Sequence, residues 1–270
     1  MSMNWAWALL WALTGLCIGS FLNVLIHRLP RMLTAPDPAY NLALPASHCP
    51  HCHTPLTVWQ KLPVLSFCLQ KGRCGHCHQA ISWRYPLVEL ANMLLWLAVG
   101  LGGLMPTTDA WPAAVAWAMA GSLLLALAWV DWDTTLLPDC LTLPLLWLGL
   151  LAAEMHWSGQ ALSQAFWGCV AGYGSFWLIA TAFEHFTGQE GLGGGDFKLL
   201  AALGAWLGPW ALIPLVFMAA LGGIGVGLVM RAQGSLREGR YVPFGPFLAG
   251  AAGVLVILGP ARTLSWLGLA

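Results

Sequence analysis

The stretch that decides the fold is Gly191-Leu192-Gly193-Gly194-Gly195-Asp196-Phe197-Lys198. Its four glycines lead directly into a carboxylate, and an apolar run, 199–207, follows at once. Glycine adopts backbone conformations closed to other residues and lets a second chain come close. A carboxylate at the edge of a membrane segment is costly and marks a candidate functional site. The stretch therefore predicts a site at Asp196 that needs a partner elsewhere in the chain.

The composition is that of an integral membrane protein. Of the 270 residues, 59% are hydrophobic and 8% are charged, whereas soluble domains carry about 25% charged residues. The formal net charge is zero, which excludes nucleic-acid binding driven by bulk positive charge. The N-terminal apolar run has no basic flank and no small-residue cleavage site after it. We therefore expect a retained helix there, and not a signal peptide that is removed.

Hydropathy predicts an all-α polytopic membrane protein with about eight transmembrane helices. A span needs about 20 mostly apolar residues. The expected spans are 5–26, 86–104, 111–130, 140–155, 161–183, 199–207, 210–230 and 244–267. The sixth, 199–207, is too short to cross a membrane unless its helix begins inside the glycine-rich stretch.

The basic residues set the orientation of these spans, because cytoplasmic loops carry the excess of Lys and Arg. With the loop after the first span placed inside, ten of the eleven basic residues fall on the cytoplasmic side. Merging the short sixth span into its neighbour would move Arg231, Arg237 and Arg240 outside, so eight spans fit better. This topology brings four aspartates to the cytoplasmic face: Asp131, Asp133, Asp139 and Asp196.

Two Cys-x-x-Cys knuckles lie between the first two spans. Structural zinc is bound tetrahedrally by four thiolates, and two such pairs commonly supply them. Thiols in a cytoplasmic loop stay reduced, which argues against disulfides. A closed four-cysteine shell has no open position for a reacting water, so such a metal stabilises the loop and does not catalyse. A redox dithiol pair is the alternative. The sequence predicts structural zinc at Cys49, Cys52, Cys74 and Cys77.

Three aspartates after the third span are candidate partners for Asp196. Asp131 closes that span and is best placed to be held rigidly. Asp133, two residues later, faces away from Asp131 on a continued helix and is the reserve candidate. Asp139 follows Pro138 at the start of the fourth span, where an acid favours the helix dipole, so we expect a structural role for it.

A pair formed by Asp131 and Asp196 points to aspartic-protease chemistry. Two carboxylates that share a site do not both ionise readily. One member then acts as general base on a water, and the protonated member activates the scissile carbonyl. The glycines before Asp196 are expected to let an extended substrate backbone approach. Lys198 either tunes the pKa of Asp196 or simply belongs to the excess of basic residues on the cytoplasmic side. We favour the second interpretation.

The alternative is a membrane transporter or channel with a broken helix at Asp196, because interrupted helices also bind ions in transporters. Transporter sites usually lie near the membrane midplane. The aspartates here are expected at one face of the membrane. That placement favours the peptidase interpretation.

These features resemble the bacterial type IV prepilin peptidases, which are Gly-x-Gly-Asp type membrane aspartic peptidases. The resemblance includes the four-cysteine loop and the glycine–aspartate stretch, and it extends over nearly the whole chain in the family's order. The further matching segments are Gly19-Ser20-Phe21-Leu22-Asn23-Val24, Arg28-Leu29-Pro30, Ile81-Ser82-Trp83-Arg84-Tyr85-Pro86-Leu87-Val88-Glu89, Asp131 to Pro144, and Pro243-Phe244-Gly245-Pro246.

The resemblance implies an inner-membrane endopeptidase that removes leader peptides from prepilins and pseudopilins at the cytoplasmic face, for type IV pili or type II secretion. It also implies N-methylation of the new N-terminal residue with S-adenosylmethionine, although no fingerprint marks where that donor binds. The family's catalytic aspartates correspond to Asp131 and Asp196, and its zinc ligands to the four cysteines. The expected partners are these substrates and the lipid bilayer, without nucleic acid. The expected domains are a first transmembrane helix (1–27), a cytoplasmic zinc domain (28–85) and a transmembrane peptidase domain (86–270).

Overall fold

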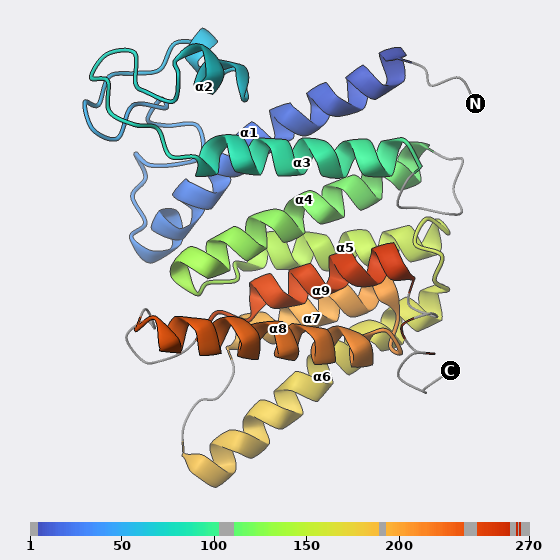
Figure 1. The fold of residues 1–270 in the computed structure, drawn as a ribbon. Coiled ribbons are helices and arrows are strands. Elements are labelled where there is room, and N and C mark those ends of the chain that lie inside the picture. The colour runs from blue at the N-terminus through green and yellow to red at the C-terminus, as the bar shows by residue number, and fades with distance from the viewer. Residues whose placement is uncertain are drawn as a thin grey trace. The chain divides into compact units, whose positions relative to one another are not determined.

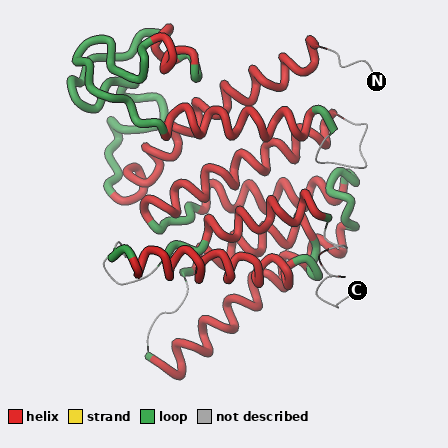
Figure 2. The backbone as a smooth tube through the Cα atoms, viewed as in Figure 1, coloured by secondary structure: helices red, strands yellow, loops and turns green. Residues whose placement is uncertain are grey.

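The computed structural model describes residues 5–102, 111–188, 193–234, 242–259, 263 and 265 (Figures 1 and 2). Within these residues the chain consists of helices, turns and loops, and no strand is formed. The predicted all-α architecture with about eight long helices is confirmed. The long helices are α1 Trp5–Thr34, α3 Arg84–Gly100, α4 Trp111–Thr134, α5 Asp139–Glu154, α6 Leu162–Thr187, α7 Gly194–Leu207, α8 Leu212–Ala232 and α9 Gly245–Leu258.

Four of these helices, α1, α4, α6 and α8, are long and apolar enough to cross a membrane by themselves. The other four are shorter, and α7 and α9 have 14 residues each. At 1.5 Å per residue such a helix is about 21 Å long, less than the ~30 Å of a bilayer core. The last predicted span, 244–267, falls partly outside the described residues. A 14-residue helix in a membrane needs neighbouring helices around it, and α7 has them.

In the second compact unit, residues 104–270, α7 is the central helix. Every residue from Leu199 to Leu207 is buried, and α5 and α6 both pack on α7 (Figure 1). α6 contributes Gly168 and Gly172, whose Cα atoms meet the α7 backbone at Gly204 and Leu200 with no room for a Cβ. Small residues four apart are typical of such close helix contacts in membranes. α4 and α8 pack on α9. α7 begins at Gly194, inside the glycine-rich stretch, as the short sixth span required.

In the first compact unit, residues 1–103, α1 and α3 lie side by side. A Cβ on Gly15 or Gly19 of α1 would lie 2.8 Å from the α3 backbone at Met93 or Glu89, so glycine permits this approach. The cysteine-bearing segment between the two helices contains a 3-10 turn, η1 Trp59–Lys61, and a short helix, α2 Leu65–Leu69. The three-part domain division made from the sequence stays a prediction.

α1 is longer than the first predicted span and continues to Thr34. The added turns contain Arg28, which is 6% exposed. Its guanidinium donates to the carbonyl oxygens of Asn41 and Pro45 at 2.8 and 2.6 Å and lies over the ring of Tyr40. These contacts compensate for the burial of the Arg28 charge. Hydropathy alone would place Arg28 in a solvated loop. Arg28 therefore ties the segment after α1 back to the helix.

Candidate active site and candidate metal centre

Asp131 lies in the last turn of α4 and is 4% exposed. Because α4 continues to Thr134, Asp133 is turned away and is exposed. The backbone N–H of Gly245, at the start of α9, donates to Asp131 Oδ2 over 2.8 Å. A buried carboxylate needs such donors to offset its lost hydration. Asp131 is thus held by a helix other than its own.

Asp196 lies in the first turn of α7 and is partly buried. Its backbone N–H donates to the carbonyl of Gly193 over 3.1 Å, which closes that turn. Its Oδ1 is enclosed and has no hydrogen-bond partner among the described residues. Asp131 and Asp196 lie close enough for their charges to interact. The structure therefore brings together the two carboxyl groups that the sequence analysis selected, and it leaves Asp133 outside the buried site.

Leu137, in the segment between α4 and α5, packs against both helix starts that carry the site. A Cβ on Gly195 would lie 2.7 Å from Leu137 Cβ, and one on Gly245 would lie 3.2 Å from Leu137 Cδ2. The second Cβ would also lie 2.7 Å from Asp131 Oδ2. The two distances of 2.7 Å are shorter than real Cβ contacts, and 3.2 Å is tighter than most of them. A side chain at either glycine would therefore displace Leu137 or Asp131.

The glycines before Asp196 consequently serve different purposes. A Cβ on Gly194 would have no described atom within 4 Å, and one on Gly193 would meet only Asp196 Oδ2 at 3.6 Å. Gly195 makes room for Leu137, so the sequence-based idea that it admits substrate does not describe its surroundings. Among the described residues, Gly193 and Gly194 leave open space for an approaching backbone.

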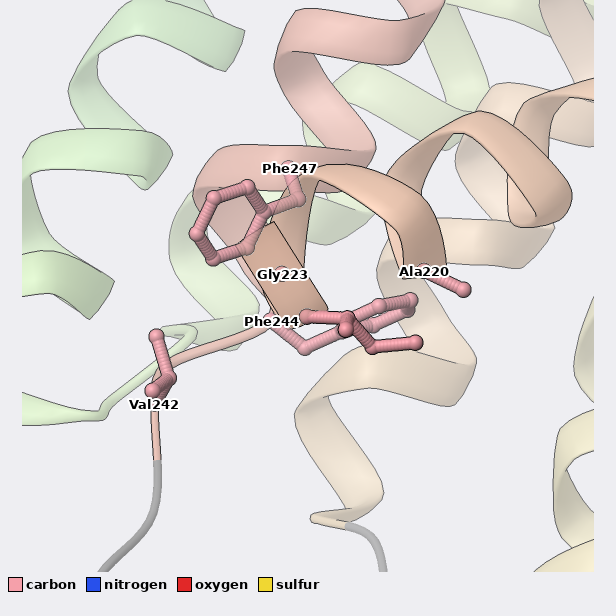
Figure 3. Close-up of a pocket in the computed structure, with 6 residues that line it drawn as sticks. Ala220, Gly223, Val242, Phe244 and Phe247 are labelled. Carbon is pink, nitrogen blue, oxygen red and sulfur yellow. The ribbon is translucent and has the colours of Figure 1, made fainter. Parts of the chain in front are cut away.

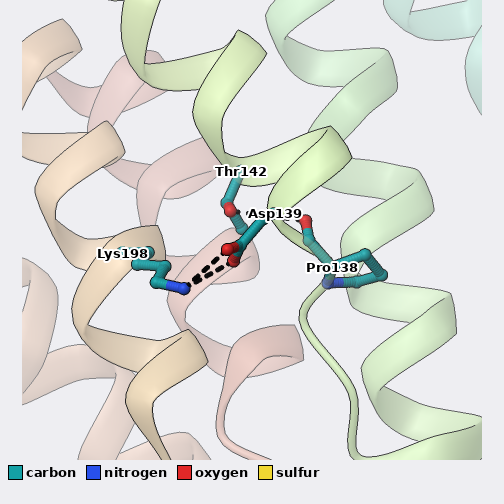
Figure 4. A network of polar contacts seen from close by, with 4 residues as sticks. All are labelled: Pro138, Asp139, Thr142 and Lys198. Atoms are coloured by element: carbon teal, nitrogen blue, oxygen red, sulfur yellow. Dashed lines mark hydrogen bonds and ion pairs between the residues drawn. The ribbon is translucent and has the colours of Figure 1, made fainter. Parts of the chain in front are cut away.

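Lys198 pairs with Asp139, as Figure 4 shows. Its Nζ lies 2.6 and 2.8 Å from the two carboxylate oxygens of Asp139, which is in the first turn of α5 directly after Pro138. Thr142 Oγ1 donates to the Pro138 carbonyl over 3.3 Å in the same turn. The contact fits the structural role expected of Asp139, and it gives Lys198 a partner other than Asp196. It also joins the starts of α5 and α7.

A hollow of about 300 Å³ lies between α8 and α9, beside the start of α9 (Figure 3). Among the described residues, its lining contains no acid, base or metal ligand. Phe244, which lines the hollow, directly precedes Gly245. The residues that line it are Ala220, Gly223, Ile224, Val242, Phe244 and Phe247.

The four predicted cysteines form one cluster whose Sγ atoms all lie within 4.8 Å of one another. The Sγ atoms of Cys49 and Cys77 are 3.8 Å apart, and those of Cys52 and Cys74 are 4.0 Å apart. A tetrahedral ion with Zn–S bonds of about 2.3 Å separates its sulfurs by about 3.8 Å. The donor set and its spacing therefore fit a metal ion of this kind.

The two cysteine knuckles have the same backbone geometry, which the sequence analysis did not identify. In each, the first cysteine donates its N–H to the residue five positions later and accepts one from the residue four positions later. In each, the histidine after the second cysteine has a positive φ, 55° and 58°. Two equivalent turns thus present four thiols to one point. The bonds are Cys49 to Thr54 (3.0 Å), His53 to Cys49 (2.9 Å), Cys74 to Gln79 (2.8 Å) and His78 to Cys74 (2.9 Å).

The four thiols differ in acidity. Hydrogen bonding with Thr54 lowers the pKa of Cys52 to about 6. The Gln79 N–H favours the thiolate of Cys77, but burial and the neighbouring cysteines raise the pKa of Cys77 to about 11. A bound dication favours the thiolate at every ligand position.

A further buried carboxylate, Glu89 of α3, is 7% exposed. It accepts the N–H of Val64 over 2.8 Å and also bonds with Ser20 and Asn23 of α1. Val64 has φ +59°, which is a strained conformation for a β-branched residue. Glu89 thus fastens the cysteine-bearing segment to α1 and α3. The sequence analysis noted its motif without a role, and so missed it, as it missed Leu137 and Gly245.

The fold and the site define a class: a polytopic helical membrane protein with a four-thiol cluster and two carboxyl groups whose charges interact. The sequence-family model of the Bacterial Peptidase A24 N-terminal domain matches residues 13–102. The sequence-family model of the Type IV leader peptidase family matches residues 118–228. The chain belongs to the type IV leader peptidase family. The resemblance seen in the sequence is confirmed.

Curated relatives match over most of their length. Three that are named prepilin leader peptidase/N-methyltransferase come from Stutzerimonas stutzeri, Pectobacterium carotovorum subsp. carotovorum and Neisseria gonorrhoeae. They are 40%, 45% and 38% identical to this chain. The alignments cover 95%, 87% and 94% of this chain and 92%, 87% and 92% of the relatives. No solved structure matches.

Proposed function

We propose that this protein cleaves the leader peptide of type IV prepilins and pseudopilins and N-methylates the residue that the cut exposes. Family membership and relatives that carry both activities in their names support this function. They do not favour the transporter alternative. The observation that carries the assignment of the site is that Asp131 lies within electrostatic range of Asp196, with Asp131 buried and Oδ1 of Asp196 enclosed.

The proposed hydrolysis uses one proton shared by the two carboxyl groups. The ionised member accepts a proton from a water molecule, whose oxygen attacks the scissile carbonyl carbon. The protonated member donates to the carbonyl oxygen while negative charge develops there. The C–N bond then breaks, and the amine leaves with a proton from the carboxyl group that took one from the water. Burial favours the state with a single negative charge over the state with two.

The cysteine cluster is proposed to hold zinc through Cys49, Cys52, Cys74 and Cys77. When bound, zinc supplies four coordinate bonds to a segment that has only short helices and two isolated bridge pairs. Its role is structural, because four thiolates fill a tetrahedral shell. S-adenosylmethionine supplies the methyl group in the second activity, and no residue of this chain is assigned to it.

The protein is proposed to lie in the bacterial inner membrane, with the cysteine segment and both aspartates on the cytoplasmic side. The distribution of Lys and Arg supports this orientation. Its partners are then prepilins or pseudopilins, which present their leaders at that face, and the surrounding lipid.

The test is cleavage of a purified prepilin by the full-length protein in proteoliposomes, with products identified by mass spectrometry. Wild-type protein should remove the leader and, with S-adenosylmethionine, add one methyl group to the new N-terminus. Asp196→Asn should abolish cleavage, whereas Asp133→Asn, a matched change at an exposed neighbour, should not. Full activity of Asp196→Asn would refute the assignment of Asp196. Ion flux lost in that variant, without cleavage by the wild type, would favour the transporter.

A further inference from the structure

We propose that Gly245 is a positioning residue for Asp131, and that the start of α9 keeps Asp131 as the ionised, water-activating member of the pair. The inference rests on the proposed peptidase function and assigns the roles within it. Gly245 belongs to the segment Pro243-Phe244-Gly245-Pro246, for which the sequence analysis found no role. It touches no substrate in this account and acts only through Asp131.

The first observation is the buried hydrogen bond from the Gly245 N–H to Asp131 Oδ2 at 2.8 Å. N–H groups in the first turn of a helix have no partner within the helix, and the helix dipole places positive potential there. A carboxylate is a better acceptor for such a donor than a neutral carboxyl group is. The contact therefore stabilises the negative charge on Asp131 and fixes one of its oxygens.

The second observation concerns Asp196. Its Oδ1 is enclosed and has no hydrogen-bond partner among the residues that the structure describes. A full negative charge is poorly supported at such an atom, whereas a hydroxyl there would donate to a substrate carbonyl oxygen. The two carboxyl groups thus have unequal surroundings. The inequality assigns the base to Asp131 and the acid to Asp196.

The third observation is that the contact requires glycine. A Cβ at position 245 would lie 2.7 Å from Asp131 Oδ2 and 3.2 Å from Asp131 Cγ and from Leu137 Cδ2. The Asp131 carboxylate would have to move away from the N–H that it accepts. Gly250 and Gly253 of α9 differ in this respect, because a Cβ on either has no described atom within 4 Å. They are matched controls for the same substitution on the same helix.

The test compares kcat and KM for leader cleavage by full-length protein carrying Gly245→Ala, Gly250→Ala or Gly253→Ala. We expect Gly245→Ala to lower kcat about ten- to a hundredfold, as loss of a hydrogen bond to a charged group does, with KM within about twofold. A merely structural defect would lower the amount of folded protein and not separate kcat from KM. Both controls should keep the wild-type kcat. A wild-type kcat in Gly245→Ala would overturn the inference.

A second comparison separates Asp131 from packing against Leu137. Leu137→Ala removes the Cδ2 atom that the new methyl group would meet, but it leaves the clash with Asp131 in place. We therefore expect the Leu137→Ala/Gly245→Ala variant to lose about as much kcat relative to Leu137→Ala as Gly245→Ala loses relative to wild type. If Gly245→Ala alone does not fold, the comparison of the double variant with Leu137→Ala is the test. Recovery of kcat in the double variant would overturn the inference. Activity in Asp131→Asn would instead refute the proposed function, so the two failures are distinguishable.

Discussion

Substituting Gly195 with alanine should impair cleavage because of Leu137, and not because substrate is excluded. The new Cβ would lie 2.7 Å from Leu137 Cβ, so the segment that carries Leu137 or the start of α7 must shift by at least about 0.7 Å to restore ordinary contact. Overpacking of this kind costs about 1–3 kcal/mol. Replacing glycine within a helix returns up to about 1 kcal/mol. The net loss of folding stability is therefore at most about 3 kcal/mol.

The catalytic effect should exceed the effect on stability, because Asp196 is the next residue in the chain. A displacement approaching 1 Å at a reacting group can cost about a hundredfold in rate. We expect Gly195→Ala to lower kcat about ten- to a hundredfold, measured as the initial rate of leader cleavage at saturating prepilin. Gly194→Ala, which adds the same methyl group where no described atom lies within 4 Å, should stay within about twofold of wild type. The reverse pattern, an active Gly195→Ala with an impaired Gly194→Ala, would refute the reasoning and assign the glycines to substrate approach.

Two further predictions concern the ion pair and the metal. Lys198 and Asp139 have side chains that are 34% and 55% exposed, so the ion pair should contribute less than about 1 kcal/mol to folding stability. Lys198→Gln, Asp139→Asn and the double variant should each keep kcat within about fivefold of wild type. A hundredfold or greater loss of kcat in any of them would contradict this prediction. Zinc removal by a strong chelator, or acidification that protonates the thiolates, should unfold the cysteine-bearing segment. Limited proteolysis should then cut between Cys52 and Cys74, whereas segment 52–74 protected equally with and without metal would contradict a structural role.

Sequence patterns predicted the features that depend on hydrophobic runs and fixed spacings. Eight long helices and the clustering of Cys49, Cys52, Cys74 and Cys77 follow from such patterns. The start of α7 inside the glycine-rich stretch was only a condition for the sixth span to cross the membrane. Span length and the Cys-x-x-Cys spacing are local properties that a single sequence displays directly. The extension of α1 to Thr34 was missed, because a buried arginine with backbone acceptors cannot be distinguished from a solvated one by hydropathy.

The contacts that shape the candidate site were less accessible. Charge distribution placed Asp131 and Asp196 at one face, but it gave no hint that Leu137 lies between the starts of α7 and α9. The role of Gly245 depends on a hydrogen bond between residues 114 positions apart, and nothing local encodes that distance. The available signal was the segment Pro243-Phe244-Gly245-Pro246 before an apolar run, which indicates a helix start. This signal does not show which side chain contacts that helix start. Tertiary packing decides which glycine faces a neighbour and which faces open space.

We propose that Asp131 and Asp196 act as one catalytic unit. The most direct test is the single-turnover rate of leader cleavage by Asp131→Asn, Asp196→Asn and the double variant, each compared with wild type at equal folded protein. The rate effects of substitutions within one catalytic unit are not additive. Each single variant should therefore lose about a thousandfold or more in cleavage rate, and the double variant should be no slower than the slower single variant. A single variant that keeps more than about a tenth of the wild-type rate would contradict the account.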